Sequence, residues 1–305
     1  MKRISFRDVG LIYTFDSRND PVAHVAAGDT VVLDVEDAFS GKITAKALAE
    51  HAEDVPFGNP IVGPIFVEGA DVGNTLSVFI KDIRPATGRG ITYLSQFTAN
   101  YLTSVPIFEF MKVELPAHPR ICKIENELIY FSDKITIPYR PMIGTIGVTP
   151  LPEAESISSV LLPGRHGGNM DIPDISRQST VFFPIFQKGA LLYMGDAHAA
   201  QGDGEISGEA IEMPAEITVE LNVIKEKINW PRIETDEELM SVATTSAARG
   251  LEDAIRTSFM DLSMWMERKY DINRFDALVL LSQVGKIRIG NLWTAVAKIE
   301  KKYLE

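Results

Sequence analysis

Glu216-Ile-Thr-Val-Glu-Leu-Asn-Val223 carries the clearest secondary-structure signal in the sequence. Polar and apolar residues alternate along it, which is typical of an antiparallel β-strand with one buried face. The segments 30–35 and 76–83 are also rich in β-branched and apolar residues, and turn signals such as Ala27-Gly28-Asp29 separate such runs. The sequence therefore predicts a mainly β fold with some α, a β-sandwich-like or barrel-like core of antiparallel strands.

The C-terminal region changes to a helical period. Apolar residues recur at helical spacing over 251–266, and a second helix is expected over 273–284. We expect a short strand or turn over 287–292 and a last helix from about Thr294. A further short helix is predicted over 42–53.

A segment with proline and serine, 150–163, divides the chain into two parts. It favours a β-rich N-terminal domain over 1–150 and a second β-rich domain over 151–305, which also contains the C-terminal helices. The alternative is one integrated fold.

The composition excludes several classes of protein. The chain has 305 residues and a net charge of -12, whereas nucleic acid and anionic membranes need clustered Lys and Arg. Cys122 is the single cysteine, so no disulfide can form within the chain. The charged N-terminus has no apolar signal core, and no apolar run approaches the roughly 18 to 20 residues of a membrane helix. We expect a cytoplasmic protein with no nucleic-acid or membrane partner.

The most unusual stretch is Gly195-Asp-Ala-His-Ala-Ala-Gln-Gly-Asp-Gly-Glu-Ile-Ser-Gly-Glu-Ala-Ile-Glu212, with five carboxylates and one histidine among four glycines. Between Lys188 and Lys225 there are seven acidic residues and no Lys or Arg. Carboxylates are rarely buried without a partner, so the segment favours a metal or catalytic site. The alternative is a solvated acidic loop.

Two segments share the residue types of such a site: His166-Gly-Gly-Asn169-Met-Asp171, and Asp196 to Glu205. Imidazole with carboxylates suits zinc or another first-row metal, whereas carboxylates with amide oxygens suit calcium or magnesium, and both kinds of site remain open. On an extended backbone Asp196 and His198 would point to the same face. Asp37, where a strand ends, is as compatible with a turn as with a site.

The sequence lacks three common hydrolase and nucleotide-binding motifs: a Gly-x-Ser-x-Gly turn, a phosphate-binding loop and a His-Glu-x-x-His helix. Cys122 lies in an alternating stretch and is interpreted as an ordinary strand cysteine rather than a nucleophile.

His166 to Asp171, together with Met194-Gly-Asp-Ala-His-Ala-Ala-Gln-Gly-Asp-Gly-Glu205, closely resembles the acetamidase/formamidase family. The resemblance extends to Gly28 to Gly41 and to Gly208-x-Ala210-Ile-Glu212. It implies a mainly β hydrolase that releases ammonia from short amides, forms a homodimer or higher homo-oligomer, and binds divalent zinc or calcium. Ser207 departs from the family pattern, in which many relatives have a cysteine before the glycine.

The resulting hypothesis is metal-assisted hydrolysis of short linear carboxamides similar to formamide or acetamide. The predicted metal ligands are Asp37, His166, Asp171, Asp196 and His198. Glu205 is the predicted general base, with Asp203 also on the proton-handling side, and Asn169 or Gln201 would hydrogen-bond the developing oxyanion. One alternative is a non-catalytic β protein that binds a divalent cation or small ligand, and another is a hydrolase of a different amide.

Overall fold

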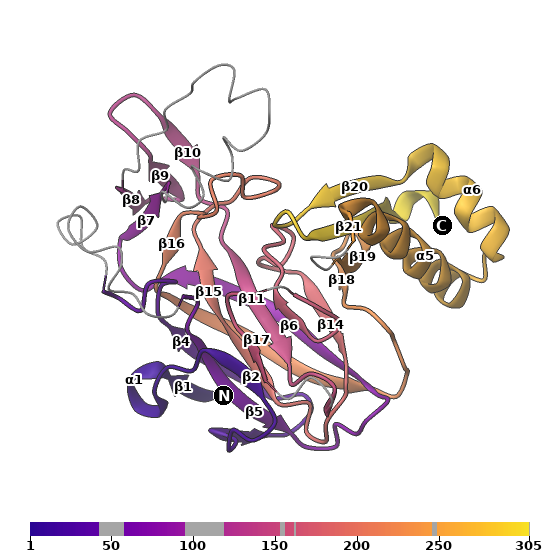
Figure 1. Cartoon of the computed structure of the whole chain (residues 1–305), viewed down its shortest axis with the longest axis horizontal. Coiled ribbons are helices and arrows are strands. Elements are labelled where there is room, and N and C mark those ends of the chain that lie inside the picture. Colours follow the sequence, from indigo (N-terminus) through magenta and orange to yellow (C-terminus); the bar gives the residue numbers. More distant parts are fainter. Residues whose placement is uncertain (43–57, 95–118, 153–155, 162, 246–248, 305) are drawn as a thin grey trace.

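The fold is built from two large β-sheets and a C-terminal pair of helices (Figure 1). It is known from a computed structural model. The residues that this structure describes are 1–42, 58–94, 119–152, 156–161, 163–245 and 249–304. The helix predicted over 42–53 lies almost entirely outside them. In the described ranges, no helix has the length and apolar character needed to cross a membrane.

The first sheet has nine strands, and neighbours pair antiparallel except for the edge pair β1 and β4. Strand β17, from the second half of the sequence, is inserted among strands from the first half. Its strands in spatial order are β1 (Lys2–Ser5), β4 (Thr30–Val35), β17 (Ala215–Ile224), β6 (Thr75–Pro85), β14 (Thr180–Pro184), β18 (Arg232–Glu234), β19 (Glu238–Thr244), β21 (Thr294–Glu300) and β20 (Lys286–Ile289). Because β17 lies between β4 and β6, we propose one integrated fold rather than two domains.

The second sheet has ten strands, and β15 is its centre because it pairs with three neighbours, β5, β11 and β16. The strands of the main path are β10 (Thr136–Pro138), β9 (Leu128–Tyr130), β8 (Pro119–Glu125), β7 (Arg89–Tyr93), β16 (Glu212–Met213), β15 (Leu192–His198), β11 (Met142–Val148) and β13 (Gly167–Asn169). Two further strands, β5 (Ile61–Val67) and β3 (Ala23–Val25), extend from β15. Cys122 is buried in β8, as predicted for a strand cysteine.

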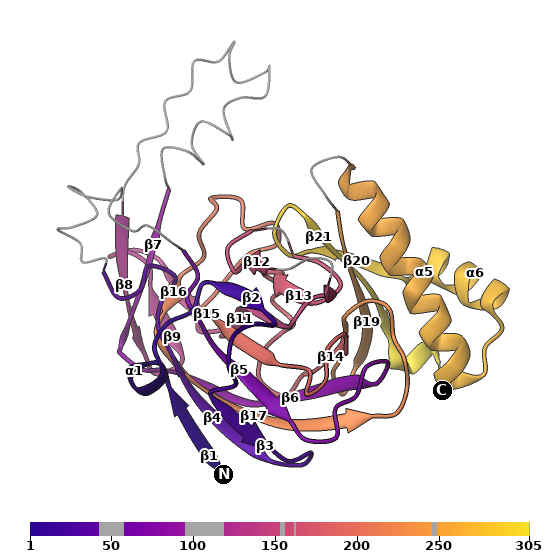
Figure 2. The ribbon, with the colours of Figure 1, turned by 60° about the horizontal axis from the view of Figure 1, so that its bottom comes forward.

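The main core lies between the two sheets. Val78 and Ile217 of the first sheet pack in one cluster with Ile143 and Met194 of the second, and all four are fully buried. Figure 2 shows the first sheet curving around β11, β13 and β15. The predicted mainly β class is confirmed. Three smaller elements are α1 (Phe6–Val9) and the two-stranded sheet of β2 (Thr14–Asp16) and β12 (Ser156–Ser158).

Both predicted C-terminal helices are present, as α5 (Leu251–Tyr270) and α6 (Arg274–Val284). Leu262 and Met266 of α5 pack on Leu239 and Ile299 of the first sheet. The Asn273 side chain accepts a hydrogen bond from the backbone N–H of Asp276 and so caps the start of α6.

The prediction of a last helix from about Thr294 is wrong. Thr294–Glu300 forms strand β21, which pairs with β19 on one side and β20 on the other. Its residues are buried up to Ile299. Lys298 is only 8% exposed, and its ammonium group forms ion pairs with Asp174 and Glu238. Pairing on both edges outweighs the weak helical preference of Ala, Lys and Glu. The chain then ends in a short 3₁₀ helix, η3 (Lys301–Tyr303).

We expect Asp261→Ala to lower the free energy of unfolding by about 3–5 kcal/mol, because it leaves the buried Arg232 guanidinium without its carboxylate. Asp261 Oδ2 accepts from Arg232 Nε at 2.8 Å and from Ser241 Oγ at 2.7 Å. Denaturant unfolding measures the loss. The control is Asp253→Ala on the same helix, whose exposed pair with Arg256 is worth less than about 1 kcal/mol. Equal losses in the two variants would contradict the account.

Candidate active site

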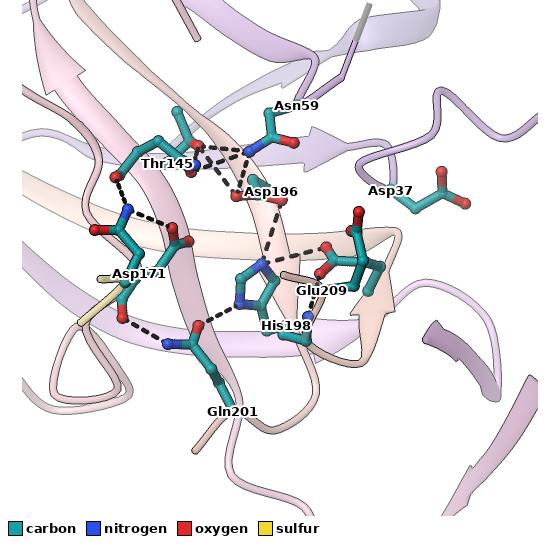
Figure 3. Close-up of polar contacts among 12 residues, drawn as sticks. Asp37, Asn59, Thr145, Asp171, Asp196, His198, Gln201 and Glu209 are labelled. Atoms are coloured by element: carbon teal, nitrogen blue, oxygen red, sulfur yellow. Dashed lines mark hydrogen bonds and ion pairs between the residues drawn. The ribbon is translucent and has the colours of Figure 1, made fainter. Parts of the chain in front are cut away.

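The end of strand β15 places a carboxylate and an imidazole side by side in the interior (Figure 3). Asp196 Oδ1 lies 3.2 Å from His198 Nε2, and the two residues are 2% and 1% exposed. Asp196 has a left-handed backbone with φ of 55°, so the local strand is not regular. The two side chains nevertheless face one another from the two sides of Ala197.

Three further carboxylates gather around this pair. Glu212 pairs with His198 in the register of β16 and β15, and its Oε2 is 3.2 Å from His198 Nε2. Ligand atoms of Asp171, Asp196 and His198 lie within 4.8 Å of one another, and so do those of His198, Glu205 and Glu212. We call these five residues the carboxylate–histidine cluster. Asp171, Asp196 and His198 are all buried and could hold a metal ion.

Gln201 fixes the orientation of the imidazole. Its Nε2 donates to the backbone carbonyl of Asp171 at 2.6 Å, so its Oε1 is left to accept the Nδ1 hydrogen of His198 at 2.9 Å. This contact places the hydrogen of a neutral imidazole on Nδ1 and leaves the Nε2 lone pair facing Asp196 and Glu212. An oriented outer partner of this kind is typical of metal-binding histidines.

Amide and hydroxyl groups hold the two aspartates in place. Asn59 Nδ2 donates to Asp196 Oδ2 at 2.9 Å, and the Thr145 hydroxyl oxygen lies 3.0 Å from the same carboxylate oxygen. Asn291 Nδ2 donates to Asp171 Oδ2 at 3.0 Å. These donors satisfy one oxygen of each carboxylate and leave the other oxygen directed into the cluster.

Four residues at the site have a left-handed backbone conformation. Asn59, Asp171, Asp196 and Glu205 all have positive φ, between 42° and 55°. Non-glycine residues rarely adopt this conformation, and it costs of order 1–3 kcal/mol each where the surrounding structure enforces it. The fold therefore holds the site residues in positions that the free chain would seldom populate.

Gly144 of β11 keeps the centre of the cluster open. A Cβ atom at this position would lie 2.5 Å from Asp196 Oδ2, 2.6 Å from Asp171 Oδ1 and 2.7 Å from His198 Cε1. Any side chain here would occupy the space between the three groups. Gly144 is therefore needed to leave room for the side chains of the site, and not for the backbone geometry of the strand.

Burial and mutual repulsion perturb the acid groups of the cluster. Burial, reinforced by the Asp196 charge, raises the pKa of Asp171 to about 7. Burial also raises the pKa of Glu212 to about 8 against the opposing effect of His198, and burial beside Asp171 raises the pKa of Glu205 well above its ordinary value. Burial alone would lower the pKa of His198, but Glu212 and Asp196 raise it well above the usual value. The cluster therefore needs positive charge.

A divalent cation fits this set of residues. Asp171 Oδ1 and Glu212 Oε2 are buried and accept no hydrogen bond from any described residue. Among the residues with described positions, no Lys or Arg forms an ion pair with the cluster, and only His198 does. Buried carboxylate oxygens without donors are costly unless a cation satisfies them. A proton on His198 Nε2 and a metal ion would compete for the same position.

A cavity of about 440 Å³ opens beside the cluster. Gln201, Glu205 and Glu209 line it, and Glu205 and Glu209 are half-buried. Burial, with the charge of Glu212, raises the pKa of Glu209 well above its ordinary value. The cavity lets a small molecule approach Glu205 and Glu209 from solvent.

The structure does not bring Asp37, Asp203 or His166 into the cluster. Asp37 Oδ1 accepts the backbone N–H groups of Phe39 and Gly41, which is the contact of a turn, and no dashed line joins Asp37 to the other residues of Figure 3. Asp203 lines the cavity, but its carboxylate is 54% exposed and pairs with Arg288 at 3.0 Å.

His166 is a buried neutral histidine. It is 3% exposed, its ring meets Phe15 edge-on at 5.1 Å, and its Nε2 has no partner among the described residues. Burial lowers the pKa of His166 to about 4.

We expect this burial to make the protein acid-sensitive between about pH 6.5 and pH 4. In that window the unfolded state binds a proton on His166 and the folded state does not. Stability therefore falls as the pH is lowered, by about 3 kcal/mol in all. Denaturant unfolding at several pH values should show a smaller loss in His166→Gln than in the wild type. In the control His24→Gln, which alters an exposed histidine, the wild-type loss should persist. An unchanged loss in His166→Gln would contradict the account.

Sequence reasoning missed three positioning residues: Asn59, Thr145 and Asn291. Asn59 lies in Gly58-Asn59-Pro60, which is typical of a turn, and nothing in the sequence singles out Asn291. Thr145 did give a signal, because it is the one polar residue in the apolar run 142–148. Glu209 and Glu212 belong to the acidic segment, but their roles could not be separated by sequence alone.

By fold, the chain belongs with solved acetamidase structures. An acetamidase from Yersinia enterocolitica superposes with a TM-score of 0.90 at 35% identity, covering 100% of this chain and 93% of that one. An acetamidase from Bacillus halodurans superposes with a TM-score of 0.87 at 31% identity, covering 99% and 98%.

The sequence model of the acetamidase/formamidase family matches residues 15–158 and 153–247. The chain belongs to the acetamidase/formamidase family. An acetamidase of Mycolicibacterium smegmatis is 28% identical over 256 residues, which are 67% of this chain and 63% of that protein. The matches span 61% to 63% of the length of the curated relatives.

Proposed function

We propose that the protein is an amidase that hydrolyses linear carboxamides to a carboxylate and ammonia. The observation that carries the proposal is the buried carboxylate–histidine cluster beside an open cavity, in a chain of this family. Relatives named acetamidase and formamidase support short amides such as acetamide and formamide as substrates.

Asp171, Asp196 and His198 are the proposed ligands of a divalent cation. When bound, the ion would polarise the amide carbonyl and lower the pKa of a water molecule toward about 7. The imidazole in this set favours zinc over calcium, which prefers oxygen ligands alone. Gln201 would keep the Nε2 lone pair of His198 directed at the ion.

Glu205 is the proposed general base, because it lines the cavity and also has a carboxylate oxygen close to His198 and Glu212. It would take a proton from the attacking water as the water oxygen bonds to the carbonyl carbon. The same carboxyl group would return the proton to the amide nitrogen as the C–N bond breaks. Ammonia and the carboxylic acid leave, so the reaction consumes one water and no other reactant.

Asn169 is the proposed donor to the developing oxyanion. Its Oδ1 accepts from Thr145 Oγ1 at 2.7 Å and from Asn59 Nδ2 at 3.0 Å, which directs its Nδ2 elsewhere. No hydrogen bond within the described ranges uses that Nδ2. Gln201 is less suited to this role, because both ends of its amide are engaged.

The test is an ammonia-release assay of the purified protein with formamide, acetamide, propionamide and larger linear amides. We expect ammonia and carboxylate to form in equal amounts from at least one of these amides. Absence of ammonia from every amide, with the metal site loaded, would overturn the proposal. A fall in melting temperature on chelation without any amide turnover would instead support a non-catalytic cation-binding protein.

A further inference from the structure

One arginine faces the cavity. Arg140 lines it together with Glu205 and Glu209. The backbone N–H of Arg140 donates to the carbonyl of Ala199 at 2.9 Å, and two residues later Met142 pairs with His198. Arg140 therefore lies beside the segment that follows strand β15, the strand that ends at His198.

The guanidinium of Arg140 has no carboxylate partner among the described residues. Other arginines near the site do: Arg288 pairs with Asp174 and Asp203, and Arg177 pairs with Glu127. A guanidinium has five N–H donors, and the fork they form matches a carboxylate. Arg140 is exposed to solvent at the edge of a strongly acidic site, so its guanidinium is free to bind an anion from solution.

The cavity is larger than a two-carbon amide requires. Its volume of about 440 Å³ is in the range that holds much larger ligands, roughly 300–1,000 Å³. Phe131, Ile137 and Ile211 contribute apolar lining to the cavity, and Glu205 and Glu209 contribute acidic lining. A short methylene chain would pack on this wall between the guanidinium and the carboxylates.

We propose that the preferred substrates are linear amides whose acyl chain ends in a carboxylate, which Arg140 binds while the amide group reaches Glu205. This inference rests on the proposed function and adds the substrate class. The distal carboxylate stays with the guanidinium, away from the repulsion of the cluster. Hydrolysis produces a dicarboxylate, and its new carboxylate forms beside Glu205 and Glu209. Repulsion between like charges then favours release of the product.

The experiment compares succinamate with isocaproamide, in which an uncharged isopropyl group replaces the carboxylate. We expect the metal-loaded wild type to have a kcat/KM at least about 10-fold higher for succinamate. Arg140→Gln should reduce this preference by about 10- to 100-fold, mainly through a higher KM for succinamate, because charge-assisted hydrogen bonds are lost. Arg140→Lys should keep part of the preference. The control Arg268→Gln, on the surface of α5, should leave it unchanged.

The outcomes separate the two proposals. No ammonia from succinamate, isocaproamide, formamide or acetamide would overturn the proposed function. Ammonia release with equal kcat/KM for succinamate and isocaproamide would overturn only the substrate class. An unchanged preference in Arg140→Gln would also overturn the substrate class, with circular dichroism used to check that the variant is folded.

Discussion

Glu205→Gln should lower kcat for amide hydrolysis by about 10²- to 10⁴-fold, the range for loss of a general acid–base group. The amide is nearly isosteric with the carboxylate but cannot accept the proton of the attacking water. Because the proposed ligands are Asp171, Asp196 and His198, the metal content should remain at the wild-type level. Ammonia release and elemental analysis on the same preparation measure both quantities.

The matched control is Asp203→Asn, which changes an acidic residue that also lines the cavity but is 54% exposed and pairs with Arg288. It should lower kcat far less than Glu205→Gln does, because Asp203 lies outside the carboxylate–histidine cluster. Full activity in Glu205→Gln would remove Glu205 from the role of base. An equal loss of kcat in Asp203→Asn would mean that both substitutions act by distorting the loop and not by removing a base.

His198→Asn should reduce both bound metal and turnover, by more than about 100-fold in activity, because it removes the one nitrogen donor of the proposed ligand set. The ring is 1% exposed, and its Nε2 faces Asp196 Oδ1 and Glu212 Oε2 at 3.2 Å each. The shorter asparagine cannot reach the same point. Elemental analysis and the ammonia assay measure the two losses.

Gln201→Ala is the comparison for this variant, because it leaves His198 in place and removes only its orienting partner. Loss of an outer partner typically costs 10- to 100-fold in metal affinity or activity, so the effect should be smaller than in His198→Asn. Wild-type metal content in His198→Asn would contradict the proposed ligand set.

The fold class could be predicted from the sequence where the spacing of apolar residues follows the buried face of a strand or helix. Alternation over 216–223 corresponds to β17, which has a half-buried face, and the helical period corresponds to α5. Prediction failed at β21, because six of the seven residues of that strand are buried by neighbours on both sides and show no clear alternation of exposure. Local preference could not reveal those neighbours.

The candidate site was predictable only where its residues are close in sequence. The spacing of Asp196 and His198 suggested one site, and the acidic segment contained Glu205 and Glu212. Asn59 and Asn291 reach the same cluster from distant parts of the chain, so only the fold relates them. His166 had a suitable residue type, but its ring packs edge-on against Phe15. The predicted cytoplasmic location and homo-oligomer stay predictions.

The central claim is that a cation held by the carboxylate–histidine cluster supports amide hydrolysis. The most direct measurement removes the metal with a chelator, restores zinc or calcium in steps, and records bound metal and ammonia release on the same samples. The account predicts that turnover disappears with the metal and returns in proportion to the metal bound per chain. Full turnover in protein shown by elemental analysis to contain no metal would contradict it.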